Sequence, residues 1–283
     1  MLKTCIHTVI LNELDEYLKV WLDHHTKMVD HIFIFEDLGS HSHKHITDQY
    51  SNVTLQSVLD LYIDNDKMRE RVINDKEKGK IVQMYYLKDG VTQIQDLNEY
   101  DWCLCADIDE FLTLQPPYTS VGEVLEEFND YVAVMLQWKN YTSNGHIEKP
   151  NYNGRDYREF YTNEGEFNNS DASFKITTKI FFNLNKSTRW HYCGLHCTVG
   201  NWVNTKFKKD RKEICYDKMY LSHHLTKSFE EYLWKIYVRG MHCGHRHRKI
   251  DHFFEIDPSM KDKYDECMKF KEEYFKKHNI TDE

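Results

Sequence analysis

The sequence predicts an α/β protein with a mostly parallel central sheet flanked by helices. Two apolar, β-prone runs enclose one helical stretch within the first forty residues. A strand–helix–strand unit of roughly this length is typical of parallel pairing, because parallel neighbours need a long crossover connection. Polar residues also follow the predicted strands at their carboxyl ends, where open α/β sheets bind ligands.

Apolar runs indicate four strands of this sheet. The first two are expected at residues 6–11 and 31–35, a third at 81–87 and a fourth at 102–106. A short helix is expected over residues 91–99. No Gly-rich phosphate loop of the GxGxxG or GxxxxGK[ST] type is present, so phosphate would have to be held by other groups.

The helix between the first two strands is predicted from its N-cap and its apolar spacing. Asn12 is a suitable cap, with Asp15 three residues later. Apolar and aromatic residues then recur at the spacing of one helix face, which predicts a buried stripe. This stripe comprises Leu14, Tyr17, Leu18, Trp21, Leu22 and His25.

Composition and charge exclude some classes of protein and of binding partner. The chain has 283 residues, of which 40% are hydrophobic and 29% charged, as in ordinary globular proteins. The net charge of −9 makes nonspecific binding to nucleic acid a poor expectation, so no nucleic-acid partner is predicted. The sequence as given shows no signal peptide and no apolar run long enough to span a membrane, so a cytoplasmic enzyme is expected.

The eight cysteines allow two interpretations of their role. Cys193 and Cys197, with His191 and His196 nearby, could hold a structural zinc ion. No second pair at such spacing supports that site, and the alternative is that the cysteines pack as small apolar side chains.

The strongest chemical signal is Asp107-Ile108-Asp109, directly after the apolar run at 102–106. In an extended segment, residues two apart point to the same face, so both carboxylates could approach one cation. Hard oxygen ligands favour Mn²⁺ or Mg²⁺, which could bridge to a substrate phosphate. The alternative is an ordinary solvated acidic turn.

A basic helix is predicted near the end of the chain. Ser228 and Glu231 form a capping box, and Lys235 and Arg239, four residues apart, share a face. Together with Lys227 they could neutralise a diphosphate, although a solvated, salt-bridged face gives the same pattern. His223 is a candidate third metal ligand, or simply a structural histidine.

These motifs together resemble the GT-A glycosyltransferases of the family 92 type and their bacterial, family 2-like relatives. The likeness covers roughly residues 6–240, and its most specific segment is Asp107 to Leu112. Its other parts are Asn12-Glu13, Tyr17-Leu18, Trp21, His24-His25, Asp37, Asp101-Trp102, Trp138, Ser143 to His146, His223, Thr226 to Ser228, Glu231, Lys235 and Arg239-Gly240.

The resemblance implies a GT-A-like, Rossmann-type fold and a metal-dependent, inverting sugar transfer. The donor would be a nucleotide-diphosphate sugar, UDP-sugar favoured, and the acceptor a glycan or glycolipid. It further implies the following roles: Asn12, Glu13 and Asp37 at the nucleoside; Asp109 on the metal; Asp107 on the metal or the ribose; His223 completing the metal shell; Lys227, Lys235 and Arg239 at the diphosphate; and Trp138, Gly145 and His146 at the acceptor.

The sequence departs from the family pattern at several positions. Glu36 stands where Asp is usual, and the His-rich stretch 40–45 replaces a Ser-x-Asp turn. Asn144 stands in place of Ser, and His224 in place of Tyr. The first two changes leave the nucleotide preference open, and the other two leave the acceptor contacts open.

An inverting transfer also needs a general base within reach of the acceptor hydroxyl. The polar stretch 142–173 offers five acidic residues, and Glu159 best matches an acidic position of the family. The candidates are Asp156, Glu159, Glu164, Glu166 and Asp171. Each of them could equally be a solvated surface carboxylate.

One glycosyltransferase domain is expected over residues 1–240, with a donor half at about 1–112 and an acceptor half at about 113–240. Residues 241–283 are predicted to form a basic segment and a C-terminal helix packed on the same domain. A basic amphipathic helix could instead touch a membrane surface. Other metal-dependent nucleotide enzymes (a nucleotidyltransferase or phosphohydrolase) and a non-catalytic carbohydrate-binding relative remain alternatives.

Overall fold

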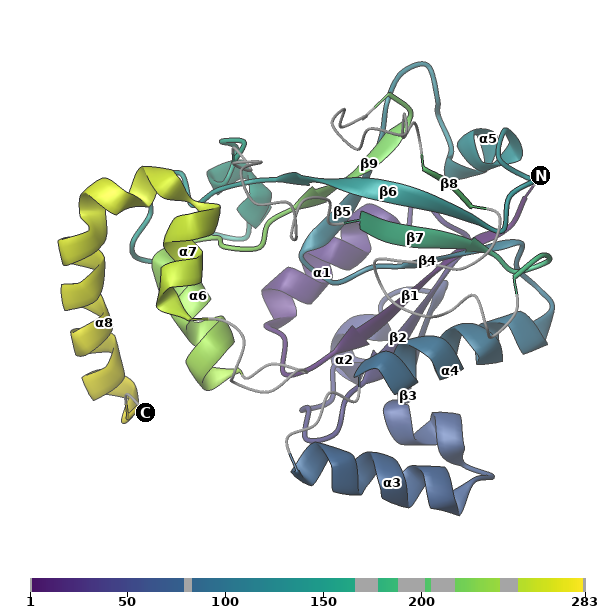
Figure 1. The fold of residues 1–283 in the computed structure, drawn as a ribbon, viewed down its shortest axis with the longest axis horizontal. Helices are drawn as coiled ribbons and strands as arrows, with labels where there is room; N and C mark the ends of the chain where they lie inside the picture. The colour runs from purple at the N-terminus through teal and green to yellow at the C-terminus, as the bar shows by residue number, and fades with distance from the viewer. Residues whose placement is uncertain are drawn as a thin grey trace. The chain divides into compact units, whose positions relative to one another are not determined.

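The computed structural model is mixed α/β and is divided into two compact units (Figure 1). The first unit comprises Met1–Trp138 and Ile176–Ser222, and the second Lys139–Lys175 and His223–Glu283. The structure describes residues 2–78, 83–165, 178–187, 202–204, 217–239 and 249–281. The residues around Cys193 that could hold zinc, part of the polar stretch 142–173 and the basic segment 241–248 lie outside these residues.

The sheet is mixed rather than mostly parallel. Its order is β3-β2-β1-β4-β7-β6-β9-β5, with β8 paired to β6. β3, β2, β1 and β4 are parallel, as predicted for the first strands, whereas β7 runs antiparallel to both β4 and β6. The strands are β1 Thr4–Ile10, β2 His31–Glu36, β3 Val53–Ser57, β4 Trp102–Cys105, β5 Glu110–Leu114, β6 Ala133–Asn140, β7 Thr178–Asn183, β8 Trp202–Asn204 and β9 Met219–His223.

Helices account for most of the remaining described chain. The first unit contains α1 Asp15–His25, α2 Lys44–Thr47, the 3₁₀-helix η1 Val58–Tyr62, α3 Asp66–Glu77, α4 Gln83–Leu97 and α5 Val121–Glu126. The second contains the 3₁₀-helix η2 Tyr157–Phe160, α6 Phe229–Leu233, the π-helical turn η3 Trp234–Val238, α7 Ile250–Ile256, the 3₁₀-helix η4 Pro258–Lys263 and α8 Tyr264–His278.

The expected strand at 81–87 is wrong, because residues 83–97 form helix α4. The third parallel strand is β3, which pairs with β2. Tyr86, Leu87, Val91 and Ile94 are all buried, and their spacing is that of one helix face. The run is rich in aromatic and apolar residues, so its local pattern also fits a strand. Packing of the apolar face against the sheet favours the helix.

Helix α1 buries the face that its sequence predicts, apart from a half-buried Leu14. Tyr17, Leu18, Trp21, Leu22 and His25 are buried. The helix begins at Asp15, and no side chain caps it, so the expected Asn12 cap is wrong. Two ring nitrogens hold the carboxyl-terminal part of α1 to the backbone of β5. Trp21 Nε1 donates to the Glu110 carbonyl at 2.9 Å, and the Leu112 amide donates to His25 Nε2 at 3.1 Å.

One face of the parallel strands packs against α4 to form a core of the first unit (Figure 1). Alternate residues of β1, β2 and β4 contribute to it because side chains alternate between the two faces of a sheet. Gly90 of α4 faces His7 of β1 across this contact. A Cβ atom at position 90 would lie 2.1 Å from His7 Nε2, so only glycine fits there.

We expect Gly90→Ala to lower the free energy of unfolding by about 1–3 kcal/mol, because overpacking forces buried groups apart. Gly122→Ala in helix α5 is the matched control, since its added methyl group would meet the Leu2 carbonyl at an ordinary 3.6 Å. Alanine is the better helix former by about 1 kcal/mol, so the control should be neutral or stabilised. Urea unfolding of both variants gives the comparison; equal stability would contradict the predicted clash.

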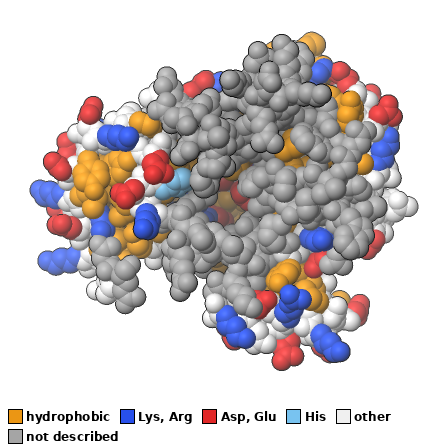
Figure 2. Space-filling view, in the orientation of Figure 1, with side chains coloured by type: hydrophobic (Ala, Val, Ile, Leu, Met, Phe, Trp, Pro, Cys, Tyr) orange, Lys and Arg blue, Asp and Glu red, His pale blue; other side chains and the backbone are white. Residues whose placement is uncertain are grey.

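The second unit has its own apolar core, formed by α6, α7 and α8. Cys267, Tyr274 and Phe275 of α8 are buried in it, whereas Tyr264 is 43% exposed. Figure 2 shows acidic and basic side chains interspersed over the α8 side of this unit.

Among the residues that the structure describes, no helix is both long enough and apolar enough to cross a bilayer.

Candidate functional site

Polar residues occupy the carboxyl ends of β1 and β2, as the sequence predicts. Asn12 follows β1 with a φ of 47°, in the left-handed region that Asn tolerates better than most residues. Its backbone N–H donates to Ser40 Oγ at 3.0 Å, and its Oδ1 accepts the His41 backbone N–H at 3.0 Å. Asn12 therefore joins the turn after β2 to the end of β1. Glu13, next in the chain, is buried.

Asp37 lies at the end of β2 and is buried beside a lysine. Its Oδ1 is 2.6 Å from Lys76 Nζ of helix α3, and the same oxygen accepts the Leu38 backbone N–H at 2.7 Å. A buried carboxylate is stable only when it is paired, and Lys76 supplies the pairing charge. No local pattern indicated that Lys76, 39 positions away, would reach this strand end.

The acidic motif after β4 is a turn, which differs from the extended segment that the sequence argument assumed. The Glu110 backbone N–H donates to the Asp107 carbonyl at 3.1 Å, and the Asp107 backbone N–H donates to Glu110 Oε2 at 2.8 Å. Asp109 is buried, whereas the Asp107 side chain is 39% exposed. The argument that both carboxylates share one face of a strand is therefore wrong, and their role at a metal stays a prediction.

A buried lysine on β7 neutralises this turn. Lys179 Nζ lies 2.8 Å from Asp107 Oδ2 and 3.5 Å from Glu110 Oε1, and both Lys179 and Glu110 are fully buried. The ammonium also lies 6.0 Å from the ring centroid of Trp138, the predicted acceptor residue. The antiparallel β7 therefore places a positive charge directly beside the acidic turn.

Burial and charge shift the titration of this cluster. Burial raises the pKa of Glu110 well above its usual range, although the Lys179 charge opposes the shift. For Lys179, burial lowers the pKa but the carboxylates of Asp107 and Glu110 outweigh it, so the pKa lies above its usual value. Lys179 therefore carries a full positive charge at neutral pH.

The predicted ligand His223 and the predicted phosphate group Lys227 belong to the second unit. His223 Nδ1 is 2.9 Å from Asn140 Oδ1, and the ring is buried. Lys227 has a φ of 49° and places its Nζ 5.1 Å from the ring centroid of Tyr157. Their roles at a metal or diphosphate stay predictions.

The predicted capping box of α6 is confirmed. The Ser228 side chain accepts the Glu231 backbone N–H at 3.2 Å, and Glu231 Oε2 accepts the Ser228 backbone N–H at 3.1 Å. The helix does not continue as expected, because residues 234–238 form a π-helical turn closed by the Arg239 N–H and the Trp234 carbonyl at 2.9 Å. Lys235 lies within this turn, and π turns frequently occur at functional sites.

The predicted acceptor residues Gly145 and His146 lie beside the start of α6. The Gly145 carbonyl accepts from Lys263 Nζ at 2.8 Å, and the His146 carbonyl accepts the Phe229 backbone N–H at 3.1 Å.

The candidate base Glu159 lies on η2. Its side chain is 56% exposed and lies 3.6 Å from the Arg155 guanidinium. Of the four other candidates, Glu166 and Asp171 lie outside the described residues.

A second group of potential ligands was not predicted. Asp15, His41 and His43 each place one ligand atom within 4.8 Å of the other two. The His-rich stretch 40–45 was noticeable in the sequence, but nothing local indicated that Asp15 would join it.

Comparisons with known proteins give only distant likenesses. No protein-family model and no curated protein matches the chain. A solved protein from Desulfovibrio desulfuricans G20, provisionally named a nucleotide-diphospho-sugar transferase, aligns over 69% of this chain and 69% of its own, with 10% identity and a TM-score of 0.33. The galactosyltransferase LgtC, solved with donor and acceptor sugar analogues, aligns over 64% and 58%, with 12% identity and a TM-score of 0.28. Likenesses this distant carry no argument about function, and the resemblance to family 92 stays a prediction.

Proposed function

We propose that the chain is a metal-dependent glycosyltransferase that transfers a sugar, with inversion, from a nucleotide-diphosphate sugar to a glycan or glycolipid. The observation that carries this proposal is the gathering of polar groups at the carboxyl ends of three neighbouring parallel strands. Asn12 and Glu13 follow β1, Asp37 follows β2, and Asp107 and Asp109 follow β4. Open α/β sheets bind nucleotide ligands at this edge.

The acidic turn suits a hard cation in its chemistry, because its carboxylates are oxygen ligands of the kind that Mn²⁺ and Mg²⁺ prefer. We assign Asp109 to the metal, and Asp107 to the ribose or to the same metal. A bound divalent cation would stabilise the negative charge that develops on the departing diphosphate. We assign His223 to the same metal, and Lys227, Lys235 and Arg239 to the diphosphate.

On the acceptor side, we assign Trp138, Gly145 and His146 to the sugar and Glu159 to the base. In this role Glu159 would accept the proton of the attacking hydroxyl while Asn12, Glu13 and Asp37 hold the nucleoside. UDP is the favoured nucleotide. Contact of the basic C-terminal helix with a membrane surface would suit a glycolipid acceptor.

The test is a donor screen. The purified chain is incubated with Mn²⁺ and each of a panel of nucleotide sugars, and released nucleoside diphosphate is measured with and without EDTA. Release of nucleoside diphosphate that EDTA suppresses supports the proposal. Release of pyrophosphate or free phosphate would instead identify a nucleotidyltransferase or phosphohydrolase, and glycan binding without turnover would identify a carbohydrate-binding protein.

Glu159→Gln should reduce turnover about 100-fold, since positioned acid–base groups contribute roughly that much or more. The donor affinity should stay nearly unchanged, because the proposed role concerns the acceptor proton alone. Glu148→Gln, an exposed acidic residue of the same unit, is the control. Steady-state kinetics separate the two effects, and wild-type turnover of Glu159→Gln would move the base to another residue.

A further inference from the structure

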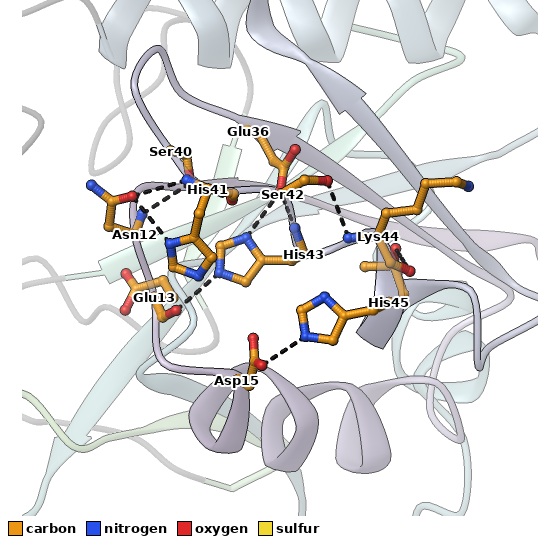
Figure 3. Close-up of polar contacts among 11 residues, drawn as sticks. Asn12, Glu13, Asp15, Glu36, Ser40, His41, Ser42, His43, Lys44 and His45 are labelled. Carbon is orange, nitrogen blue, oxygen red and sulfur yellow. Dashed lines mark hydrogen bonds and ion pairs between the residues drawn. The ribbon is translucent and has the colours of Figure 1, made fainter.

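Two histidines and one aspartate meet at the amino end of α1, and none of the three belongs to the acidic turn of the proposed reaction. Asp15 is the first residue of α1, and His41 and His43 belong to the turn between β2 and α2. Figure 3 shows the two imidazole rings side by side, with the Asp15 carboxylate directed toward them. The ring centroids are 4.3 Å apart.

Each histidine is held through its Nδ1 atom by an oxygen acceptor. His43 Nδ1 is 3.0 Å from Glu36 Oε1, and His41 Nδ1 is 3.3 Å from Asn12 Oδ1 (Figure 3). A neutral imidazole that donates from Nδ1 keeps a lone pair on Nε2. Metal-binding histidines are commonly oriented in this way, with the second ring nitrogen donating to a carboxylate or carbonyl.

The surroundings of His43 give an independent indication. The ring is fully buried, and its Nε2 lies 2.9 Å from the Glu13 carbonyl oxygen. Two oxygen atoms, Glu36 Oε1 and the Glu13 carbonyl oxygen, therefore face the two ring nitrogens, and a cation bound at Nε2 would also meet the Glu13 carbonyl. Glu36, a residue at which the sequence departs from the family pattern, is what fixes this orientation.

We propose that Asp15, His41 and His43 bind a transition-metal ion of the Zn²⁺ type, with the Glu13 carbonyl as a further ligand and Glu36 as the residue that positions His43. Imidazole nitrogens select such metals over Mg²⁺ and Mn²⁺.

The observed spacing is compatible with a bound ion. In a tetrahedral shell, metal–ligand bonds of about 2.0–2.2 Å place ligand atoms about 3.3–3.6 Å apart, closer than the 4.8 Å within which the three atoms lie here. Asp15 and His41 are exposed and can close this difference by side-chain rotation. His45 Nε2 lies 2.7 Å from Asp15 Oδ2, and the second carboxylate oxygen supplies the metal ligand.

Metal binding is tested on the full chain with Zn²⁺ by calorimetry and with Co²⁺ by visible absorption. Every protein used carries Cys193→Ser and Cys197→Ser, so that these cysteines cannot contribute. We expect Co²⁺ bound at this site to give a d–d absorption that lacks a sulfur charge-transfer band. Zn²⁺ should also raise the thermal midpoint, because a ligand of the native state stabilises it.

Single substitutions test which residues bind the Zn²⁺ ion. His41→Ala and Asp15→Ala, both at exposed positions, should weaken Zn²⁺ binding about 100-fold or more, and Glu36→Gln about 10–100-fold, the usual range for a positioning partner. His252→Ala, a partly exposed histidine of the second unit, should bind as the parent does. Circular dichroism checks that each variant is folded.

Two results would overturn the proposal. Zn²⁺ could bind His41→Ala as tightly as the parent, which would place the ion elsewhere. The parent could also fail to bind Zn²⁺, which would show that Glu36 and the Glu13 carbonyl hold His43 by hydrogen bonds alone. Neither result depends on nucleotide-sugar turnover, so the metal site and the proposed transferase activity succeed or fail separately.

Discussion

Lys179→Met should lower the free energy of unfolding by about 3–5 kcal/mol, because it leaves the fully buried Glu110 without its pairing charge. Methionine keeps the length and most of the apolar volume of lysine, so the loss reports on charge rather than on a cavity. Urea unfolding at about pH 7 measures the difference. A loss below about 1 kcal/mol would mean that the ammonium contributes little.

The loss should also depend on pH. Burial already raises the pKa of Glu110, and removing Lys179 removes the main opposing interaction, so the pKa rises further in the variant. A folded-state pKa above the unfolded one gives stability that is present at low pH and lost as the pH rises through the folded pKa. The gap between wild type and Lys179→Met should therefore be wider at about pH 8 than at about pH 5.

Two controls isolate the buried pair. Lys44→Met breaks an exposed ion pair, in which Lys44 Nζ lies 2.8 Å from Asp48 Oδ1, and should change stability by less than about 1 kcal/mol. Glu110→Gln combined with Lys179→Met should recover part of the loss, because the remaining buried group is then neutral. A fully additive double variant would show that the two residues do not interact energetically.

Asp109→Ala should abolish sugar transfer, with turnover reduced at least about 100-fold, while the chain stays folded. The proposed role of Asp109 is to hold the cation that stabilises the leaving diphosphate, and single electrostatic groups of this kind are typically worth about 10²–10³ in turnover. Metal-dependent binding of the nucleotide should be lost together with turnover. Product release and nucleotide binding with Mn²⁺ are the two measurements.

The control for this variant is Asp130→Ala, which removes a fully exposed carboxylate of the same unit. Its turnover should equal that of wild type. Full activity of Asp109→Ala in excess EDTA would remove the metal from the mechanism, while the donor screen would still decide whether sugar is transferred.

Local pattern predicted a good part of the fold. The strands at 4–10, 31–36 and 102–105 were expected to within two residues, as were their polar carboxyl ends. The pattern failed at 81–87, where apolar and aromatic residues fit both a strand and a buried helix face. It also failed for Asn12, whose amide oxygen accepts from the turn after β2 rather than capping α1.

The sequence by itself determined what depends on near neighbours: the buried stripe of α1, the capping box of α6 and the acidic motif after an apolar strand. Only the tertiary structure decided which distant charges meet, since β7 brings Lys179 to Asp107 across 72 positions and the turn after β2 brings His41 and His43 to Asp15. The physical reason is that hydrophobic spacing specifies which face is buried, whereas a polar side chain finds its partner only after the strands have paired.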